Sequence, residues 1–373
     1  MRGSSFYRPD QIFIEEAVRD CQLTQTVLDK LPEVEVFHVR DSRDLRRSPR
    51  RRELPIPTGK RSLLIAKHQG TFFKPCPASQ VQGGRRNVCC NYFVVNLASN
   101  CHMECSYCYL QTHLNFPLMV VYANIDDLLE ELSGVLREKK QNFYRIGTGE
   151  LADSLALDPL TESSRPLVEF FAQQSNAVLE FKTKSNCVEH LLGLPHEGRT
   201  VVSWSMNTRH IQSREEHKTA TIDERLLAAQ RCVEDGYRVG FHFDPIVYYS
   251  DWEQDYEELI REVFGCFSPS SLAWVSVGAL RMTSDLRKTI LRRFPGSTLP
   301  TGELVPCPDG KLRYTKSIRR IMYERVFGWI RQYGSSDLGI YACMERPEVW
   351  SRIFNTAPLT DIEIGDSVTA GFQ

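Results

Sequence analysis

The sequence contains no run of apolar residues close to the ~20 that a membrane-spanning helix requires. It carries almost no net charge, −1 over 373 residues, and residues 1–8 lack the apolar core of a secretory signal peptide. These absences argue against membrane insertion and give no overall sign of a nucleic-acid binder. We therefore expect a cytoplasmic chain whose twelve cysteines are thiols or metal ligands rather than disulfides.

Three of the cysteines stand close together. Cys101, Cys105 and Cys108 form a Cys-x3-Cys-x2-Cys run. A [4Fe–4S] cube normally takes four protein thiolates, so three thiolates would leave one iron open for reaction. A zinc site is the first alternative, but it would need a fourth Cys or His, and His102 adjoins Cys101 too closely to share one ion with it. Chance clustering among twelve cysteines is the second alternative.

The spacing, with Tyr107 directly before the third cysteine, resembles the signature of the radical S-adenosylmethionine (radical SAM) enzymes. The resemblance implies a [4Fe–4S] cluster whose open iron chelates the amine and carboxylate of S-adenosylmethionine (SAM). It also implies that one electron cleaves SAM to a 5′-deoxyadenosyl radical.

Strand and helix patterns alternate from residue 89 onward. Buried runs predict strands at 92–98, 143–146, 177–183, 200–206, 237–246 and 272–280, and amphipathic runs predict helices at 125–139, 165–174, 222–235 and 252–264. This order predicts an α/β fold with a parallel sheet curved into a partial (β/α)6 TIM-type barrel. Sites in such barrels lie at the C-terminal ends of the strands, and the cysteine loop follows the first strand.

The remaining segments flank this barrel. We expect a small N-terminal α/β unit with a linker over residues 1–88, the barrel over 89–300, and a C-terminal helical extension over 301–373, which includes a late strand or extended segment at 339–345.

Several runs outside the cysteine loop resemble spore photoproduct lyase in order and spacing. They lie at 108–112, 121–127, 181–184, 189–192, 202–207, 223–228, 240–246 and 252–256. The resemblance covers residues 5 to 325 and implies radical reversal of a thymine photoproduct in DNA. It also implies roles for single residues. Tyr107 and Tyr109 match tyrosines that relay a hydrogen atom, or they only pack the loop. Lys184, Ser205 and Asn207 fall at strand ends where the family contacts SAM.

One departure from the lyase bears on its mechanism. Glu150 stands where the lyase has its hydrogen-donating cysteine, and a carboxylate O–H bond is too strong to donate a hydrogen atom as a thiol does. Gly147, Gly149 and Glu150 instead resemble a Gly-Gly-Glu element that binds the SAM amine; an exposed turn is the alternative. Asp244 replaces a small apolar residue and either binds substrate or caps a turn. Cys343 is our candidate for a substitute donor, although a buried thiol is also an ordinary small hydrophobe.

Positive charge gathers in three segments, 43–52, 281–293 and 311–320, which either contact phosphates or form solvated faces. We thus expect a monomeric enzyme that uses SAM, takes electrons from a flavodoxin- or ferredoxin-like donor and binds DNA through these segments. One alternative is a lyase-like radical SAM enzyme that acts on RNA, a peptide or a metabolite. An alternative of another class is a non-catalytic iron–sulfur or zinc protein that binds nucleic acid.

Overall fold

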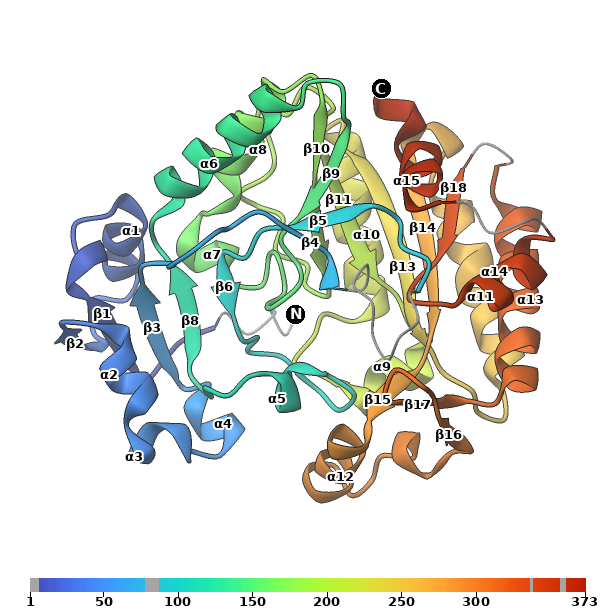
Figure 1. The fold of residues 1–373 in the computed structure, drawn as a ribbon, viewed down its shortest axis with the longest axis horizontal. Helices are drawn as coiled ribbons and strands as arrows, with labels where there is room; N and C mark the ends of the chain where they lie inside the picture. Colours follow the sequence, from blue (N-terminus) through green and yellow to red (C-terminus); the bar gives the residue numbers. More distant parts are fainter. Residues whose placement is uncertain (1–6, 78–86, 336–337, 356–359) are drawn as a thin grey trace.

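The computed structural model describes residues 7–77, 87–335, 338–355 and 360–373. Two sheets organise these residues, a smaller one formed mainly by the N-terminal unit and a larger curled one (Figure 1).

The smaller sheet has the strand order β2-β1-β3-β8-β6. Its strands are β1 (Gln11–Glu15), β2 (Glu35–Val39), β3 (Ser62–Ala66), β6 (Ala98–Ser99) and β8 (Met119–Tyr122). All pair in parallel except β6, which runs antiparallel to β8. The N-terminal unit adds the helices α1 (Gln22–Lys30), α2 (Ser42–Arg47), α3 (Pro49–Arg52) and α4 (Ile56–Gly59). Strands β6 and β8 lie beyond residue 88, outside the predicted N-terminal unit, but they pair within this smaller sheet. The cysteine loop connects these two strands, so the smaller sheet anchors the loop at both ends.

The larger sheet has the order β18-β14-β13-β11-β10-β9-β5-β4. Its strands are β4 (Lys74–Pro75), β5 (Tyr92–Val94), β9 (Tyr144–Gly147), β10 (Ala177–Thr183), β11 (Thr200–Ser205), β13 (Arg238–Ile246), β14 (Leu272–Ala279) and β18 (Gly339–Ala342). Each of the six predicted barrel strands is present, and all pair in parallel. The C-terminal segment adds β18, parallel to β14, and β4 closes the other edge antiparallel to β5. The partial TIM-type barrel is confirmed.

Helices follow the barrel strands along the chain and cover the outer face of the sheet (Figure 1). They are α6 (Ile125–Glu138), α8 (Ser164–Ala172), α10 (Ile222–Glu234), α11 (Trp252–Cys266) and α13 (Lys316–Tyr333), and α14 (Pro347–Phe354) and α15 (Asp361–Thr369) follow near the C-terminal end. In the part of the chain that the structure describes, no helix combines the length and the apolar character needed to cross a bilayer.

The remaining elements are short and connect the longer strands and helices. They are α5 (Leu110–His113), α7 (Asp158–Thr161), α9 (Arg209–Glu215), α12 (Ser284–Arg293), the pair β7 (Glu104–Cys105) and β12 (Glu216–His217), and the three-stranded sheet β15 (Arg281–Thr283), β16 (Leu304–Pro306) and β17 (Lys311–Tyr314).

Side chains fill the barrel interior below the strand ends. The buried Glu180 carboxylate accepts hydrogen bonds from Ser203 at 2.6 Å, Trp274 at 2.7 Å and His242 at 2.8 Å. Arg145 neutralises this carboxylate at 2.7 Å. A buried charge is tolerated only when it is paired and hydrogen-bonded, and this network satisfies both conditions. Space for ligands is therefore found at the strand ends rather than inside the barrel.

Candidate functional site

The cysteine loop lies where the chain crosses between the two sheets, near α5 in Figure 1. Its entry is fixed by Asn100, which adopts φ 78°, a left-handed conformation that asparagine tolerates better than most residues. The Asn100 side chain accepts a hydrogen bond from the Cys101 amide at 2.9 Å and donates one to the Pro117 carbonyl at 2.9 Å. Asparagine thus sets the turn that places the first cysteine.

The three predicted cysteines come together. Cys105 packs with Met103 and Ala156, and Cys101 and Cys108 pack against this small cluster. Burial raises the pKa of all three thiols, to about 12 for Cys101. A bound metal must therefore displace the thiol protons and compensate the buried negative charge, as iron does when it binds thiolates.

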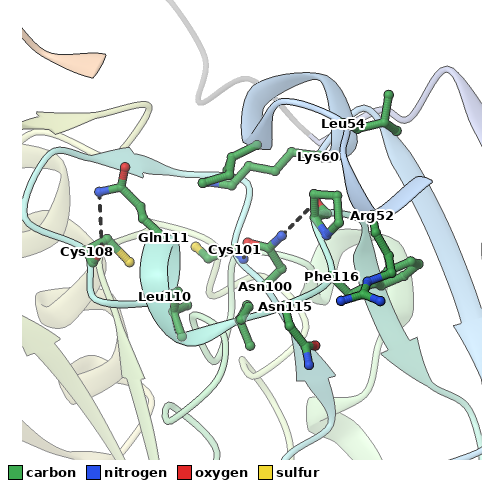
Figure 2. Close-up of a pocket in the computed structure, with 13 residues that line it drawn as sticks. Arg52, Leu54, Lys60, Asn100, Cys101, Cys108, Leu110, Gln111, Asn115 and Phe116 are labelled. Atoms are coloured by element: carbon green, nitrogen blue, oxygen red, sulfur yellow. Dashed lines mark hydrogen bonds between the residues drawn. The ribbon is translucent and has the colours of Figure 1, made fainter. Parts of the chain in front are cut away.

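The donor set fits a [4Fe–4S] cluster. A cavity of about 160 Å³ adjoins Cys101 and Cys108 and is also lined by Lys60 (Figure 2). The His102 ring packs against Tyr7, with 5.6 Å between ring centroids. The donors that the loop offers to a cluster are therefore the three cysteine sulfurs. In a cube each thiolate binds a different iron, so the sulfurs need not meet at one point. Among the described residues, no three His, Cys, Asp or Glu side chains do so.

Two basic side chains hold the cysteine loop from opposite sides. From the N-terminal unit, Lys60 donates to the Met103 carbonyl at 2.7 Å and pairs with Glu104 at 3.2 Å. From α12, Arg293 pairs with the same Glu104 carboxylate at 2.5 Å and donates to Gln111. The loop is therefore fixed both by the N-terminal unit and by α12, which follows the last of the six predicted barrel strands along the chain.

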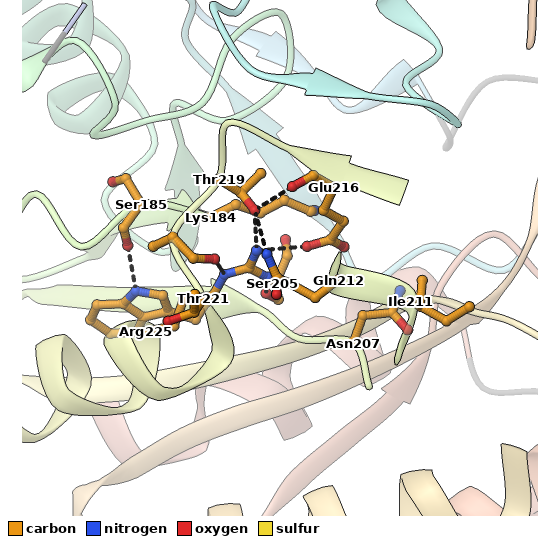
Figure 3. Close-up of polar contacts among 12 residues, drawn as sticks. Lys184, Ser185, Ser205, Asn207, Ile211, Gln212, Glu216, Thr219, Thr221 and Arg225 are labelled. Carbon is orange, nitrogen blue, oxygen red and sulfur yellow. Dashed lines mark hydrogen bonds and ion pairs between the residues drawn. The ribbon is translucent and has the colours of Figure 1, made fainter. Parts of the chain in front are cut away.

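The two tyrosines of the loop have different partners. The Tyr107 hydroxyl donates to the buried carboxylate of Glu216, and the Tyr109 hydroxyl donates to the backbone carbonyl of Glu150. Arg225 binds the Glu216 carboxylate at 2.6 Å (Figure 3). Burial acts to raise the pKa of Glu216, but Arg225 and other groups hold it below its usual value. Sequence reasoning missed the roles of Glu216 and Arg225. Glu216 lies about a hundred residues beyond the cysteine run and outside every run that resembles the lyase, and Arg225 lies within the run 223–228 but carries no motif that shows its partner.

Lys184 and Ser205 lie beside this network (Figure 3). Lys184 follows β10, and its ammonium nitrogen is 5.9 Å from the centroid of the Tyr107 ring. Ser205 ends β11, is 4 % exposed, and accepts a hydrogen bond from Arg225 through its backbone carbonyl at 2.8 Å. The structure thus places both predicted residues at strand ends next to the cysteine loop.

Asn207 also lies just beyond β11, but its side chain is occupied. Its amide oxygen accepts a hydrogen bond from the Tyr256 hydroxyl at 2.6 Å, and its NH2 group donates to the Pro245 carbonyl at 3.0 Å. These contacts tie the end of β11 to the end of β13.

The segment after β9 carries the predicted glycine–glutamate element. A Cβ at Gly147 would lie 1.5 Å from the Tyr92 hydroxyl, and one at Gly149 would lie 3.2 Å from the Lys182 Cβ. The requirement for glycine at 147 therefore comes from packing inside the protein. Glu150 is half-buried, and its carboxylate accepts a hydrogen bond from an asparagine of the β5–β6 connection, Asn96, at 2.7 Å.

Cys343 directly follows β18, and its amide donates to the Val277 carbonyl at 2.8 Å. Burial, reinforced by the charge of Asp244, raises the pKa of the Cys343 thiol to about 12. Asp244 pairs with Arg281 at 3.0 Å. Burial acts to raise the pKa of Asp244, but Arg281 and Lys182 hold it well below its usual range. Asp244 is thus an ionised partner of Arg281, and it stands beside Cys343.

The three basic segments differ in how far their charges are free. In the second and third segments some arginines form buried ion pairs, as Arg313 does with Asp309 and Arg319 with Glu345, both at 2.6 Å. In the first segment, α2 and α3 expose Arg47, Arg50 and Arg52 to solvent, whereas Arg43 is exposed but pairs with Asp41. Phosphate contacts are therefore open to only part of the predicted basic residues.

Comparison with known proteins gives a consistent result. The family model described as spore photoproduct lyase matches residues 7–305. The chain is 32% identical to spore photoproduct lyase of Geobacillus sp. over 214 residues, which is 57% of this chain and 63% of the relative, so the match spans less than two thirds of that protein. It is 24% identical to spore photoproduct lyase of Bacillus subtilis over 302 residues, 79% of this chain and 85% of the relative.

Solved structures show the same fold. A spore photoproduct lyase double mutant with bound AdoMet and dinucleoside spore photoproduct superposes with a TM-score of 0.77 at 24% identity, covering 90% of this chain and 98% of that one. A spore photoproduct lyase complexed with dinucleoside spore photoproduct gives the same values.

Proposed function

The chain belongs to the spore photoproduct lyase family of radical SAM enzymes, and from that premise we propose that it cleaves SAM reductively at a [4Fe–4S] cluster. The observation that carries the proposal is the gathering of Cys101, Cys105 and Cys108 in one loop at the strand ends of a partial barrel. When bound, the cluster supplies an electron and an iron free of protein thiolate, so that SAM yields methionine and a 5′-deoxyadenosyl radical.

Residues at the neighbouring strand ends hold SAM in this proposal. Glu150 accepts a hydrogen bond from the SAM amine as a charged acceptor, and the absence of a side chain at Gly149 allows the backbone to approach the ligand. Lys184 provides positive charge for the SAM carboxylate, and Ser205 provides a hydroxyl. The internal hydrogen bonds of Asn207 favour a role in shaping this edge of the site.

The substrate that we propose is a thymine photoproduct in DNA. The support comes from relatives whose structures hold dinucleoside spore photoproduct and from exposed basic residues of the second and third segments, such as Lys288, Arg292 and Arg320, which suit phosphates. The lesion would have to leave the base stack to reach the strand ends. We place the enzyme in the cytoplasm as a monomer, since a reducing compartment keeps its thiols available for iron.

Cys343 closes the reaction in this scheme. The 5′-deoxyadenosyl radical takes a hydrogen atom from the photoproduct and becomes 5′-deoxyadenosine, the bond that joins the two thymines breaks, and a carbon radical remains on the product. The Cys343 S–H bond gives a hydrogen atom to this carbon radical and leaves a thiyl radical. The thiyl radical regains a hydrogen atom from the methyl group of 5′-deoxyadenosine, relayed through Tyr107 and Tyr109, and the 5′-deoxyadenosyl radical is formed again. The support is the position of Cys343 at a strand end beside the Asp244–Arg281 pair.

Repair of a defined lesion tests the substrate. The reconstituted enzyme is incubated with SAM, a reductant and a photoproduct-containing oligonucleotide, and thymine recovery and 5′-deoxyadenosine are measured together. We expect thymine recovery to exceed 5′-deoxyadenosine formation, because the scheme converts 5′-deoxyadenosine back to its radical in each turnover. Formation of 5′-deoxyadenosine without thymine recovery would favour a second candidate, a lyase-like enzyme acting on RNA, a peptide or a metabolite. Glu150 at the place of the lyase cysteine is the observation that favours this candidate.

A further inference from the structure

The first basic segment borders, through Arg52, the cavity that reaches the cysteine thiols. The cavity is lined on one side by Cys101 and Cys108 and on the other by Arg52 and Lys60 of the N-terminal unit (Figure 2). Both cysteines retain partial exposure. A redox group held by these thiols is therefore reached from solvent through an opening with basic residues on one side.

The segment beside this cavity carries an excess of positive charge. Residues 41–61 hold eight arginines and lysines against three carboxylates. Arg46 and Arg51 lie over the rings of Phe116 and Phe13, with 5.0 and 4.7 Å to the ring centroids, so the protein fixes two of the charges in place.

Three further arginines of this segment have no carboxylate to neutralise them. Within the residues that the structure describes, Arg47, Arg50 and Arg52 form no ion pair, and all three are exposed. We call the surface formed by Arg47, Arg50 and Arg52 the basic face. A face of this kind attracts acidic partners over about 8 Å at physiological ionic strength.

We propose that the basic face is the docking surface for a small acidic one-electron redox protein, which delivers its electron through the Cys101–Cys108 cavity. The inference rests on the proposed function, because that reaction requires a reduced cluster. The position of the face favours a redox protein over DNA. The face lies on α2 and α3 of the N-terminal unit (Figure 1), whereas the predicted substrate groups Asp244 and Cys343 lie at the ends of β13 and β18 on the other side of the barrel.

A charge-reversal pair tests the docking surface. The variant Arg50→Glu/Arg52→Glu removes no contact to a carboxylate and should fold as the parent chain does. The matched control is Lys139→Glu/Lys140→Glu, which makes the same change of charge at exposed positions just beyond the C-terminal end of α6. The probe is a bacterial flavodoxin. Its affinity for each chain is measured by titration, and its rate of cluster reduction is measured by stopped flow at low and high salt.

We expect the Arg50→Glu/Arg52→Glu variant to bind flavodoxin at least about tenfold more weakly and to be reduced about tenfold more slowly at low salt, with the difference shrinking at high salt. The control should match the parent. Photoreduced deazaflavin, a small reductant that needs no docking surface, should reduce all three proteins equally.

Three results would overturn the proposal. They are an unchanged flavodoxin rate in the variant, an equal loss in the control, and loss of oligonucleotide affinity with flavodoxin affinity retained, which would assign the face to DNA. Failure of the parent chain to cleave SAM with deazaflavin would instead refute the proposed function, while flavodoxin affinity would still report on the docking surface.

Discussion

Replacing Glu150 with glutamine separates the charge of this residue from its shape. The carboxylate is half-buried and accepts a hydrogen bond from Asn96 at 2.7 Å. A glutamine oxygen can accept the same hydrogen bond, so the segment after β9 should keep its conformation. What is lost is the negative charge of the oxygen that accepts a hydrogen bond from the SAM amine.

The expected size of the effect follows from this geometry. A hydrogen bond to a charged group contributes about 1.5–3 kcal/mol and a neutral one about 0.5–1.5 kcal/mol. The midpoints of these ranges differ by about 1.3 kcal/mol, which corresponds to an affinity for SAM about ninefold weaker. Partial exposure of Glu150 argues against a larger value, because water screens the charge.

The assay is an anaerobic calorimetric titration of the cluster-loaded Glu150→Gln chain with SAM. Glu234→Gln is the control, because Glu234 is exposed at the end of α10, before β13 begins. We expect only the first variant to lose affinity. Equal affinity in parent and Glu150→Gln would refute the assignment and would support the exposed-turn interpretation of this segment.

Further substitutions probe the cluster, the buried pair and the hydrogen donor. Cys105→Ser should lower bound iron and abolish SAM cleavage, as measured by iron analysis and 5′-deoxyadenosine formation. Arg225→Met leaves Glu216 buried without its partner, so the free energy of unfolding should fall by about 3–5 kcal/mol, read from denaturant curves; an unchanged midpoint would show that the pair is not needed for stability. Cys343→Ser should leave SAM cleavage intact while thymine recovery falls at least about tenfold, and full recovery would assign the donor elsewhere.

The sequence predicted the parts of the molecule that depend on local pattern. The spacing of Cys101, Cys105 and Cys108 can be recognised in a single short loop, and apolar runs separated by amphipathic helices identified the six central barrel strands. These patterns can be read from the sequence because they depend only on residues that lie close together along the chain.

Contacts between distant segments could not be predicted in this way. Strand β8 pairs with β3 from more than fifty residues away, and Tyr107 meets Glu216 across 109 positions. The pairing of Asp244 with Arg281 likewise depends on how β13 and β15 are placed by the whole sheet. Neither local periodicity nor a motif predicts these contacts, so the residues that form them can be identified only in the folded structure.

Anaerobic reconstitution followed by SAM cleavage tests the central claim most directly. The chain is loaded with iron and sulfide, reduced, and supplied with SAM, and metal content and 5′-deoxyadenosine are measured on the same sample. The account predicts a four-iron cluster and 5′-deoxyadenosine that depends on Cys101, Cys105 and Cys108. Zinc without iron, or a reduced cluster that leaves SAM intact, would contradict it.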